Sequence, residues 1–214
     1  VQALERVLAE DLAVARAVLE ATAITEADRV ARAVAVVLEA HSGRALALLR
    51  EMVRAEVGGT ESAGTLFRAN SMVSKVFKFY SRMVGLPYLY KTIGPEVCAI
   101  VFEDRGVEVD PEKMEEGADL DEMRWSLMAE SQKLLKSILR SEADVPGAFV
   151  ELFRHVRAEV AGKFPAAADT TIGGFLFLRF FCPAVSSPEA HGIVDEAPSA
   201  SARRMLIQIG RAHV

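Results

Sequence analysis

Residues 30–57 read VARAVAVVLEAHSGRALALLREMVRAEV. Apolar side chains return every three or four positions, first over Val30–Leu38 and again over Leu46–Val57, with charged residues between them. This spacing follows the turn of an α-helix and not the alternation of a strand, so it predicts two amphipathic helices. Gly58-Gly59 is expected to end the second helix and to open a loop that runs to Gly64.

The same period recurs along the rest of the chain. It predicts further helices over residues 4–19, 73–84, 93–102, 120–139 and 149–160. Thr25 with Asp28 fits a capping box at the start of the helix over Val30–Leu38, and Gly85-Leu86-Pro87 is expected to close the helix over 73–84. No stretch alternates long enough for a sheet, so we expect an all-α fold with one domain over residues 1–208.

The composition is that of a soluble globular protein. The 214 residues hold 25 Lys+Arg against 30 Asp+Glu, and 51% are apolar. A chain of this length buries roughly 70% of its unfolded surface, so its core needs no metal or disulfide. The cysteines and histidines lack the spacing of a metal site or a disulfide framework, which favours a metal-free, cytoplasmic protein. The longest uncharged stretch, Thr170–Leu178, is too short for a membrane helix, so no direct membrane insertion is expected.

The sequence lacks the motifs of several enzyme classes. It contains no GxxxxGK[ST] phosphate loop, no GxGxxG after a strand, no GxSxG elbow and no HExxH. No Cys–His pair and no Ser, His and Asp set is brought together by helical spacing. We therefore expect no cofactor and no nucleotide site belonging to this chain alone.

Charge is unevenly distributed along the chain. Every charged residue between Thr65 and Lys91 is basic, whereas residues 103–124 hold ten acidic and three basic side chains. The basic run suits an acidic protein partner, although ordinary solvated helix faces are the simpler explanation, since charge runs usually keep a surface soluble. Nucleic acid is not expected as a partner, because the acidic chain lacks the broad basic surface that phosphate backbones require.

Two arginines stand in unusual surroundings. Arg68 lies between a glycine-bearing loop and a new helix that Asn70 or Ser71 could cap, where its side chain can project outwards. A guanidinium there carries a permanent charge and a planar set of donors suited to phosphate, although a plain surface arginine is the alternative. Arg179 lies inside FLFLRFF, residues 175–181, so its charge needs buried partners. It either pairs with a core glutamate or braces a functional loop through backbone carbonyls.

Two blocks of sequence carry a family resemblance. They are TLFRANS, residues 65–71, and FLRFFCPAV, residues 177–185, with Pro188. The blocks between them fall in the same order and spacing: Tyr88-Leu89, Glu108–Pro111, Ser141 with Pro146, and Phe164-Pro165. Over roughly Thr65–Leu206 the chain resembles the Ras GTPase-activating protein (Ras-GAP) domain, with neurofibromin-like members nearest.

The resemblance implies an all-helical domain that docks on a GTP-bound Ras-like small GTPase and speeds hydrolysis of the bound GTP. Such a protein is an activator of a partner enzyme, and it acts at a membrane through that partner. Arg68 would be the catalytic arginine finger, and Arg179 would hold the finger loop in place. The GTPase-binding groove would be formed by Thr65, Leu66, Phe67, Asn70, Leu178, Pro183, Ala184 and Arg204.

The C-terminus departs from the family pattern. Residues 209–214 match the translation of a sequencing adapter, and a lysine that helps family members to bind Ras would fall near Arg211. We therefore expect a truncated domain that is incomplete at its C-terminus. Two other functions compete with activation: a Ras-binding scaffold without acceleration, against which the presence of Arg68 argues, and a helical interaction domain unrelated to GTPases.

Overall fold

A computed structural model describes residues 11–68, 70–110, 114, 117 and 119–211. All regular secondary structure in these residues is helical, which confirms the all-α prediction. The chain divides into two compact units, one of residues up to 84 with 146–175 and one of residues 85–145 with 176 onwards. Each unit is described separately below, and the single domain over residues 1–208 stays a prediction.

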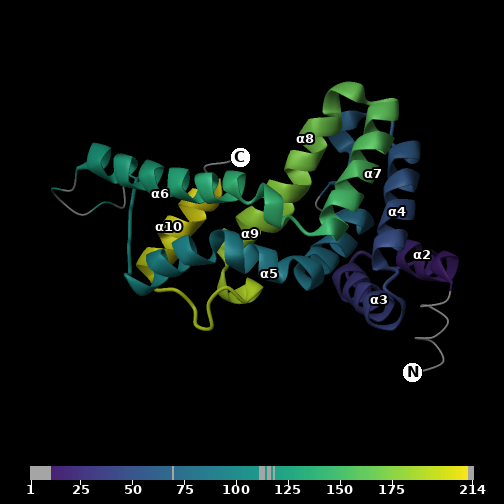
Figure 1. The fold of residues 1–214 in the computed structure, drawn as a ribbon, viewed down its shortest axis with the longest axis horizontal. Coiled ribbons are helices and arrows are strands. Elements are labelled where there is room, and N and C mark those ends of the chain that lie inside the picture. The colour runs from purple at the N-terminus through teal and green to yellow at the C-terminus, as the bar shows by residue number, and fades with distance from the viewer. Residues whose placement is uncertain (1–10, 69, 111–113, 115–116, 118, 212–214) are drawn as a thin grey trace. The chain divides into compact units, whose positions relative to one another are not determined.

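The first unit is a helical bundle around one apolar core. Its helices are α2 (Leu12–Glu20), α3 (Ala27–Ser42), α4 (Ala45–Gly59), the first part of α5 (Met72–Phe102), α7 (Gly147–Lys163) and α8 (Ala168–Gly173). Helices α4 and α7 lie side by side in this unit (Figure 1). Leu38, Leu49 and Phe77 are fully buried, as the period of the sequence predicts.

The predicted capping box at the start of α3 is wrong. The residue that precedes the helix is Glu26, and it makes no side-chain cap hydrogen bond. The carboxylate of Asp28 instead accepts a hydrogen bond of 2.9 Å from Lys75 Nζ of α5. Asp28 therefore pairs with a lysine that is distant in sequence and does not cap the start of α3.

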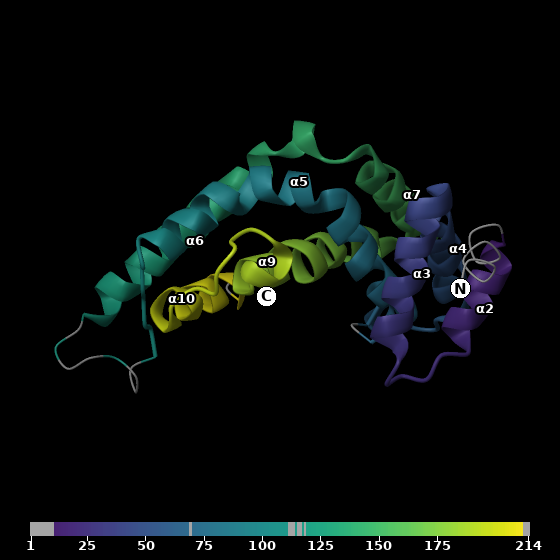
Figure 2. The same cartoon turned by 90° about the horizontal axis from the view of Figure 1, so that it is seen from below.

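The second unit contains the rest of α5, helix α6 (Leu120–Arg140), most of the π-helix Gly174–Phe181, α9 (Cys182–Ser186) and α10 (Ala200–Arg211). Helix α10 packs against α9 and α6 (Figure 2). Ile209 is fully buried and Gly210 lies against Ser186 of α9. Residues 212–214 lie outside the described residues, so the adapter origin of 209–214 stays a prediction.

The expected break at Gly85-Leu86-Pro87 is also wrong. Helix α5 runs without interruption from Met72 to Phe102, with Pro87 and Pro95 inside it. A proline inside a helix costs about 3 kcal/mol, since it removes a backbone donor and crowds the preceding turn. Tyr88, Leu89 and Ile93 are buried on the same helix, and their burial offsets that cost.

The helical run Pro165–Ser186 contains 22 residues and is the one described segment long and apolar enough to cross a membrane. It exceeds the uncharged stretch counted in the sequence because the helix continues through Arg179 and Pro183. The core helix of a soluble protein meets the same criterion, so the lack of membrane insertion stays an expectation.

Candidate functional site: the Arg68 loop

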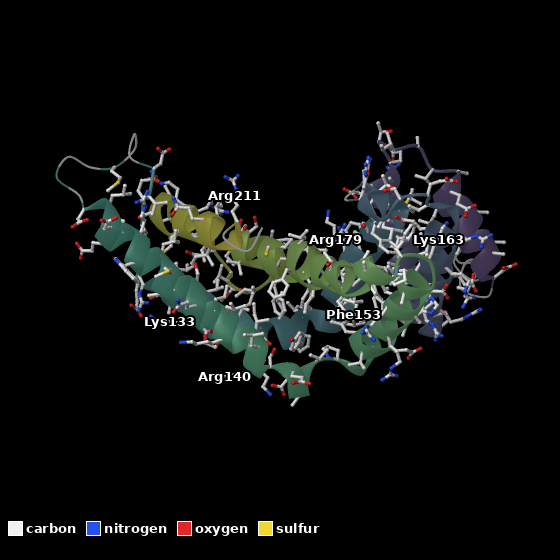
Figure 3. The ribbon with its side chains drawn as sticks, turned by 90° about the horizontal axis from the view of Figure 1, so that it is seen from above. Lys133, Arg140, Phe153, Lys163, Arg179 and Arg211 are labelled. Carbon is white, nitrogen blue, oxygen red and sulfur yellow. The ribbon has the colours of Figure 1, made fainter. Side chains whose placement is uncertain are left out.

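The loop that carries Arg68 begins at the end of α4, where Lys163 of α7 fastens it. Lys163 Nζ donates hydrogen bonds to the carbonyl oxygens of Val57 and Gly58, at 3.1 and 2.8 Å (Figure 3). A cation at the C-terminus of a helix satisfies carbonyls that lack a partner in the helix and complements the helix dipole. The base of the loop is therefore tied to a neighbouring helix of the same unit.

A short 3₁₀ turn, Ala63–Thr65, follows. Both the backbone N–H and the hydroxyl of Thr65 donate to the carbonyl oxygen of Ser62, at 3.0 and 2.8 Å. Thr65 is exposed and Leu66 is half-buried. The turn thus satisfies its own backbone while it presents two of the predicted groove residues.

Phe67 is the anchor of the loop. Its side chain is 1% exposed, and its ring centroid lies 5.0 Å from that of Phe175. Its backbone has φ +48°, a left-handed conformation that is an outlier for a bulky residue. Two hydrogen bonds hold this strained backbone: Phe67 N donates to Glu56 Oε1 at 2.6 Å, and Ser74 Oγ donates to Phe67 O at 3.0 Å.

Arg68 follows directly and is exposed. Its carbonyl oxygen accepts a hydrogen bond of 2.8 Å from Ser71 N, and Ser71 Oγ accepts one of 3.2 Å from Ser74 N. Ser71 therefore caps α5, one of the two residues that the sequence offered for that role. No hydrogen bond or ion pair of the Arg68 guanidinium is found among the described residues, so a fixed backbone presents a side chain to solvent.

Three residues that support this loop escaped the sequence analysis. Glu56, Ser74 and Phe175 lie on α4, on α5 and in the π-helix, and each one contacts Phe67. Phe175 also packs edge to face on Phe77, with ring centroids 4.8 Å apart. Only the folded chain brings these positions together: Phe175 stood out merely as part of the apolar run 175–181, and no local pattern marked Glu56 or Ser74.

Arg179 lies in the π-helix Gly174–Phe181 of the second unit (Figure 3). It is half-buried and interacts with its surroundings, in line with the expectation that its charge needs partners. The sequence marked residues 175–181 as an apolar stretch but gave no sign of its π geometry. Such wide turns are rare in helices and are frequent at functional sites.

The remaining predicted groove residues differ in accessibility. Asn70 is exposed in the first unit, and Leu178 is 46% exposed in the second. Pro183 is half-buried, and Arg204 is exposed with Nη1 3.4 Å from Glu108 Oε2. Ala184 is fully buried, as Phe67 is, so these two residues can only support a surface from below.

The basic run from Thr65 to Lys91 is partly neutralised within the chain. Lys75 and Lys78 both pair with Asp28, and Lys91 pairs with Asp144 at 2.6 Å. The hydrogen bond from Lys75 holds the pKa of Asp28 below its usual value. The charge available to an acidic partner is therefore smaller than the sequence count indicates.

The described residues contain no group of three or more His, Cys, Asp or Glu side chains placed to hold a metal ion. Cys98 and Cys182 are free thiols, and burial raises the pKa of each. A thiol with a raised pKa is a poor nucleophile. The exposed Arg68 on its fixed backbone is therefore the most distinctive chemical feature of the described residues.

Comparison with known proteins identifies the family. The family model described as "GTPase-activator protein for Ras-like GTPase" matches residues 48–126 and 119–212. "Probable Ras GTPase-activating-like protein ngap" of Dictyostelium discoideum is 32% identical over 173 residues, which cover 79% of this chain and 20% of that protein. "Ras GTPase-activating protein 3" of Rattus norvegicus is 29% identical over 174 residues, or 80% of this chain and 21% of that protein.

"RasGAP-activating-like protein 1" of Homo sapiens is 30% identical over 191 residues, which cover 79% of this chain and 24% of that protein. The chain thus spans about a fifth to a quarter of the length of these relatives. A closer kinship with neurofibromin stays a prediction. Since the family model covers both the Arg68 loop and the Arg179 helix, the chain belongs to the family of GTPase-activating proteins for Ras-like GTPases.

Proposed function

We propose that this chain activates GTP hydrolysis by a Ras-like small GTPase, and that Arg68 is the group it inserts into the partner's active site. The observation that carries the proposal is the pairing of a fully buried, strained Phe67 with an exposed Arg68 immediately after it. Membership of the Ras-GAP family supplies the class of partner. The GTP-bound form is the expected target, because hydrolysis requires it.

A guanidinium group is chemically suited to the role proposed for Arg68, which is to stabilise negative charge on the phosphates. Charge develops between the β- and γ-phosphates as GTP is hydrolysed, and a permanently charged planar fork of donors offsets that charge. For Ras with its activators the whole acceleration is about 10⁵-fold. The Arg68 carbonyl already accepts a hydrogen bond from Ser71, but a carbonyl oxygen has a second lone pair. That lone pair is free to accept from the partner's water-positioning glutamine.

Preorganisation is the second part of the proposal. A loop that had to order itself on docking would lose affinity to conformational entropy. Glu56 and Ser74 hold the two backbone polar groups of Phe67, and Phe175 covers its ring, so the backbone before Arg68 is set in the free chain. The free energy of binding is then not spent on ordering the loop and can instead stabilise the transition state of GTP hydrolysis.

Arg179 is proposed as a positioning residue for the same loop. It is half-buried and follows Phe175, the residue that contacts Phe67, by one helical turn. A guanidinium at that place can tie backbone carbonyls together through several donors at once. The role resembles that of the arginine in the family's Phe-Leu-Arg motif.

The chain itself is proposed to have no nucleotide site and no cofactor, and to act in the cytoplasm, recruited to a membrane through its partner. The test is a hydrolysis assay against a panel of purified Ras and Rap proteins loaded with GTP. We expect accelerated phosphate release with at least one of them, and preferential binding to the GTP-bound form. Binding without any acceleration across the panel would favour a Ras-binding scaffold. No binding to any member would contradict the proposal that a Ras-like GTPase is the partner.

A further inference from the structure

A cavity of about 320 Å³ opens between α3 and α5 in the first unit. It is lined by Arg32, Val36, Phe79, Arg82 and Met83. Two of these residues are basic and three are apolar, and no carboxylate lines it among the described residues. We call it the Arg32–Arg82 cavity.

The two arginines lack the partners that other basic residues of this unit have. Lys75 and Lys78, on the same helix as Arg82, both pair with Asp28. Neither Arg32 nor Arg82 makes an ion pair or a side-chain hydrogen bond within the described part of the chain. Partial burial and the nearby charge of Arg32 lower the pKa of Arg82. Arg32 is exposed and Arg82 is half-buried, and an anion between the two like charges would relieve their repulsion.

The apolar part of the lining is accessible to a ligand. Val36 is 42% exposed, Met83 is 37% exposed, and Phe79 is half-buried with Lys78 Nζ 5.1 Å from its ring centroid. Hydrophobic side chains left at a cavity beside charged groups are typical of ligand sites, which combine apolar walls with a few convergent polar groups. The volume lies at the lower end of the range for such sites, which begins at about 300 Å³.

We propose that the Arg32–Arg82 cavity binds a phosphate monoester carried on a hydrocarbon chain, with the two guanidinium groups on the phosphate and the apolar side chains against the hydrocarbon. Two guanidinium charges balance a monoester, which carries about two negative charges at neutral pH, better than they balance a carboxylate. A free phosphate would leave the apolar walls unused. None of the residues that line the cavity belongs to the predicted GTPase-binding groove, and the proposal does not rest on the function proposed for Arg68.

The test uses the whole chain and titrates hexyl phosphate by isothermal calorimetry. Each of the variants Arg32→Gln and Arg82→Gln is expected to weaken binding about tenfold, the effect of removing one charge-assisted hydrogen bond. The double variant should show no measurable binding. Inorganic phosphate should bind the parent about tenfold more weakly than hexyl phosphate, because it buries no methylene groups.

Arg29→Gln is the matched control. Arg29 lies on the same helix as Arg32, is exposed and pairs with Glu26, and it does not line the cavity. Its replacement should leave hexyl phosphate binding within about twofold of the parent, in the range of a screened surface charge. Circular dichroism and a melting curve for each variant show whether its fold is intact.

A second arm separates the two sources of such a ligand. Phosphatidylcholine vesicles with and without phosphatidate are sedimented with the parent and with the double variant. Retention of the parent alone, and only with phosphatidate, supports the proposal with a lipid headgroup as the ligand. Hexyl phosphate binding without vesicle retention supports it with a soluble ligand. If the parent does not bind hexyl phosphate, or the double variant binds it equally well, the proposal is wrong.

Discussion

At the scale of single residues, the position of Arg68 depends on Glu56. The carboxylate of Glu56 accepts a hydrogen bond of 2.6 Å from the backbone N–H of Phe67, which is buried and has φ +48°. Hydrogen bonds to ionised groups are the stronger kind, worth about 1.5–3 kcal/mol. The geometry of the loop therefore depends on a residue of α4, outside the loop itself.

Glu56→Ala is expected to lower stimulated GTP hydrolysis about tenfold, because the loop loses the anchor that sets its backbone. Binding to the GTP-loaded partner should fall less. Glu56→Gln keeps a side-chain oxygen that accepts from Phe67 N–H, so it should retain most of the activity. Single-turnover hydrolysis at saturating activator measures both variants. Equal activity of Glu56→Ala and the parent would show that the loop needs no such support.

A second prediction at this scale concerns Asp28 and the pH dependence of the free energy of unfolding. Lys75 and Lys78 hold the pKa of Asp28 below its ordinary value of 3.8. A depressed folded-state pKa stabilises the protein above the unfolded value, and the effect is lost as pH falls from about 4 through the folded pKa. Asp28→Asn should lower the free energy of unfolding at pH 7 by no more than about 1 kcal/mol, since the Asp28 side chain is exposed to screening by solvent. Urea unfolding should show the difference shrinking as pH falls below about 4, and a difference that stays constant over that range would contradict the account.

At the scale of elements, Tyr88 links α5 to the end of α6 within the second unit. Its hydroxyl lies 2.8 Å from Ser141 Oγ, and Ser141 Oγ also donates to the carbonyl of Ile138 at 2.7 Å. Both residues are buried, and the ring of Tyr88 stacks on Phe180 with an interplanar angle of 6°. Tyr88 therefore connects α5 with the end of α6 through its hydroxyl and with the π-helix through its ring.

Replacing Tyr88 by Phe should cost about 1 kcal/mol of unfolding free energy, because Ser141 keeps its bond to Ile138. Ser141→Ala should cost more, about 2 kcal/mol, since it leaves the buried Tyr88 hydroxyl without a partner. Denaturant unfolding of the two variants beside the parent gives the comparison. The reverse order of the two losses would mean that the contact does not bear on stability as described.

How well the sequence predicted each helix depends on whether clear sequence signals mark the helix and its ends. Helices α4, α6 and α7 were expected close to their observed bounds because each shows a clear 3.6-residue period, which Gly58-Gly59 ends in the case of α4. Helix α5 was divided in two because Pro87 ordinarily closes a helix, whereas buried side chains on both sides of it keep the helix intact. The π-helix Gly174–Phe181 could not be predicted, because no sequence period or capping residue distinguishes a π-helix from an α-helix.

At the scale of the whole molecule, the sequence marked Arg68 and Arg179 as candidates because both stand in motifs of consecutive residues. It could not locate Glu56, which lies 11 positions before Phe67, or Phe175, which meets Phe67 only in the folded chain. It also overstated the free basic charge, because Asp28 and Asp144 neutralise lysines from distant segments. A motif consists of neighbouring residues and can be read from the sequence. The contacts that hold the Arg68 loop and the ion pairs of the lysines join residues that only the fold brings together.

Arg179 supplies the prediction at this scale. Arg179→Ala should strongly reduce stimulated hydrolysis with a smaller effect on docking, and it should lower the melting temperature more than Arg68→Ala does, because Arg179 is half-buried and Arg68 is exposed. Arg179→Lys, which keeps the charge but loses the planar fork, should recover stability better than activity. Equal melting temperatures for Arg179→Ala and Arg68→Ala would contradict the positioning role.

The central claim is that Arg68 supplies charge to another protein's active site, and single-turnover GTP hydrolysis tests it most directly. The parent, Arg68→Ala and Arg68→Lys are each added in saturating amounts to a GTP-loaded Ras-type partner that the parent activates. We predict that Arg68→Ala loses about 10³-fold or more of the stimulated rate, while its affinity for the GTP-bound partner and its melting temperature stay near those of the parent. Undiminished stimulation by Arg68→Ala would contradict the account.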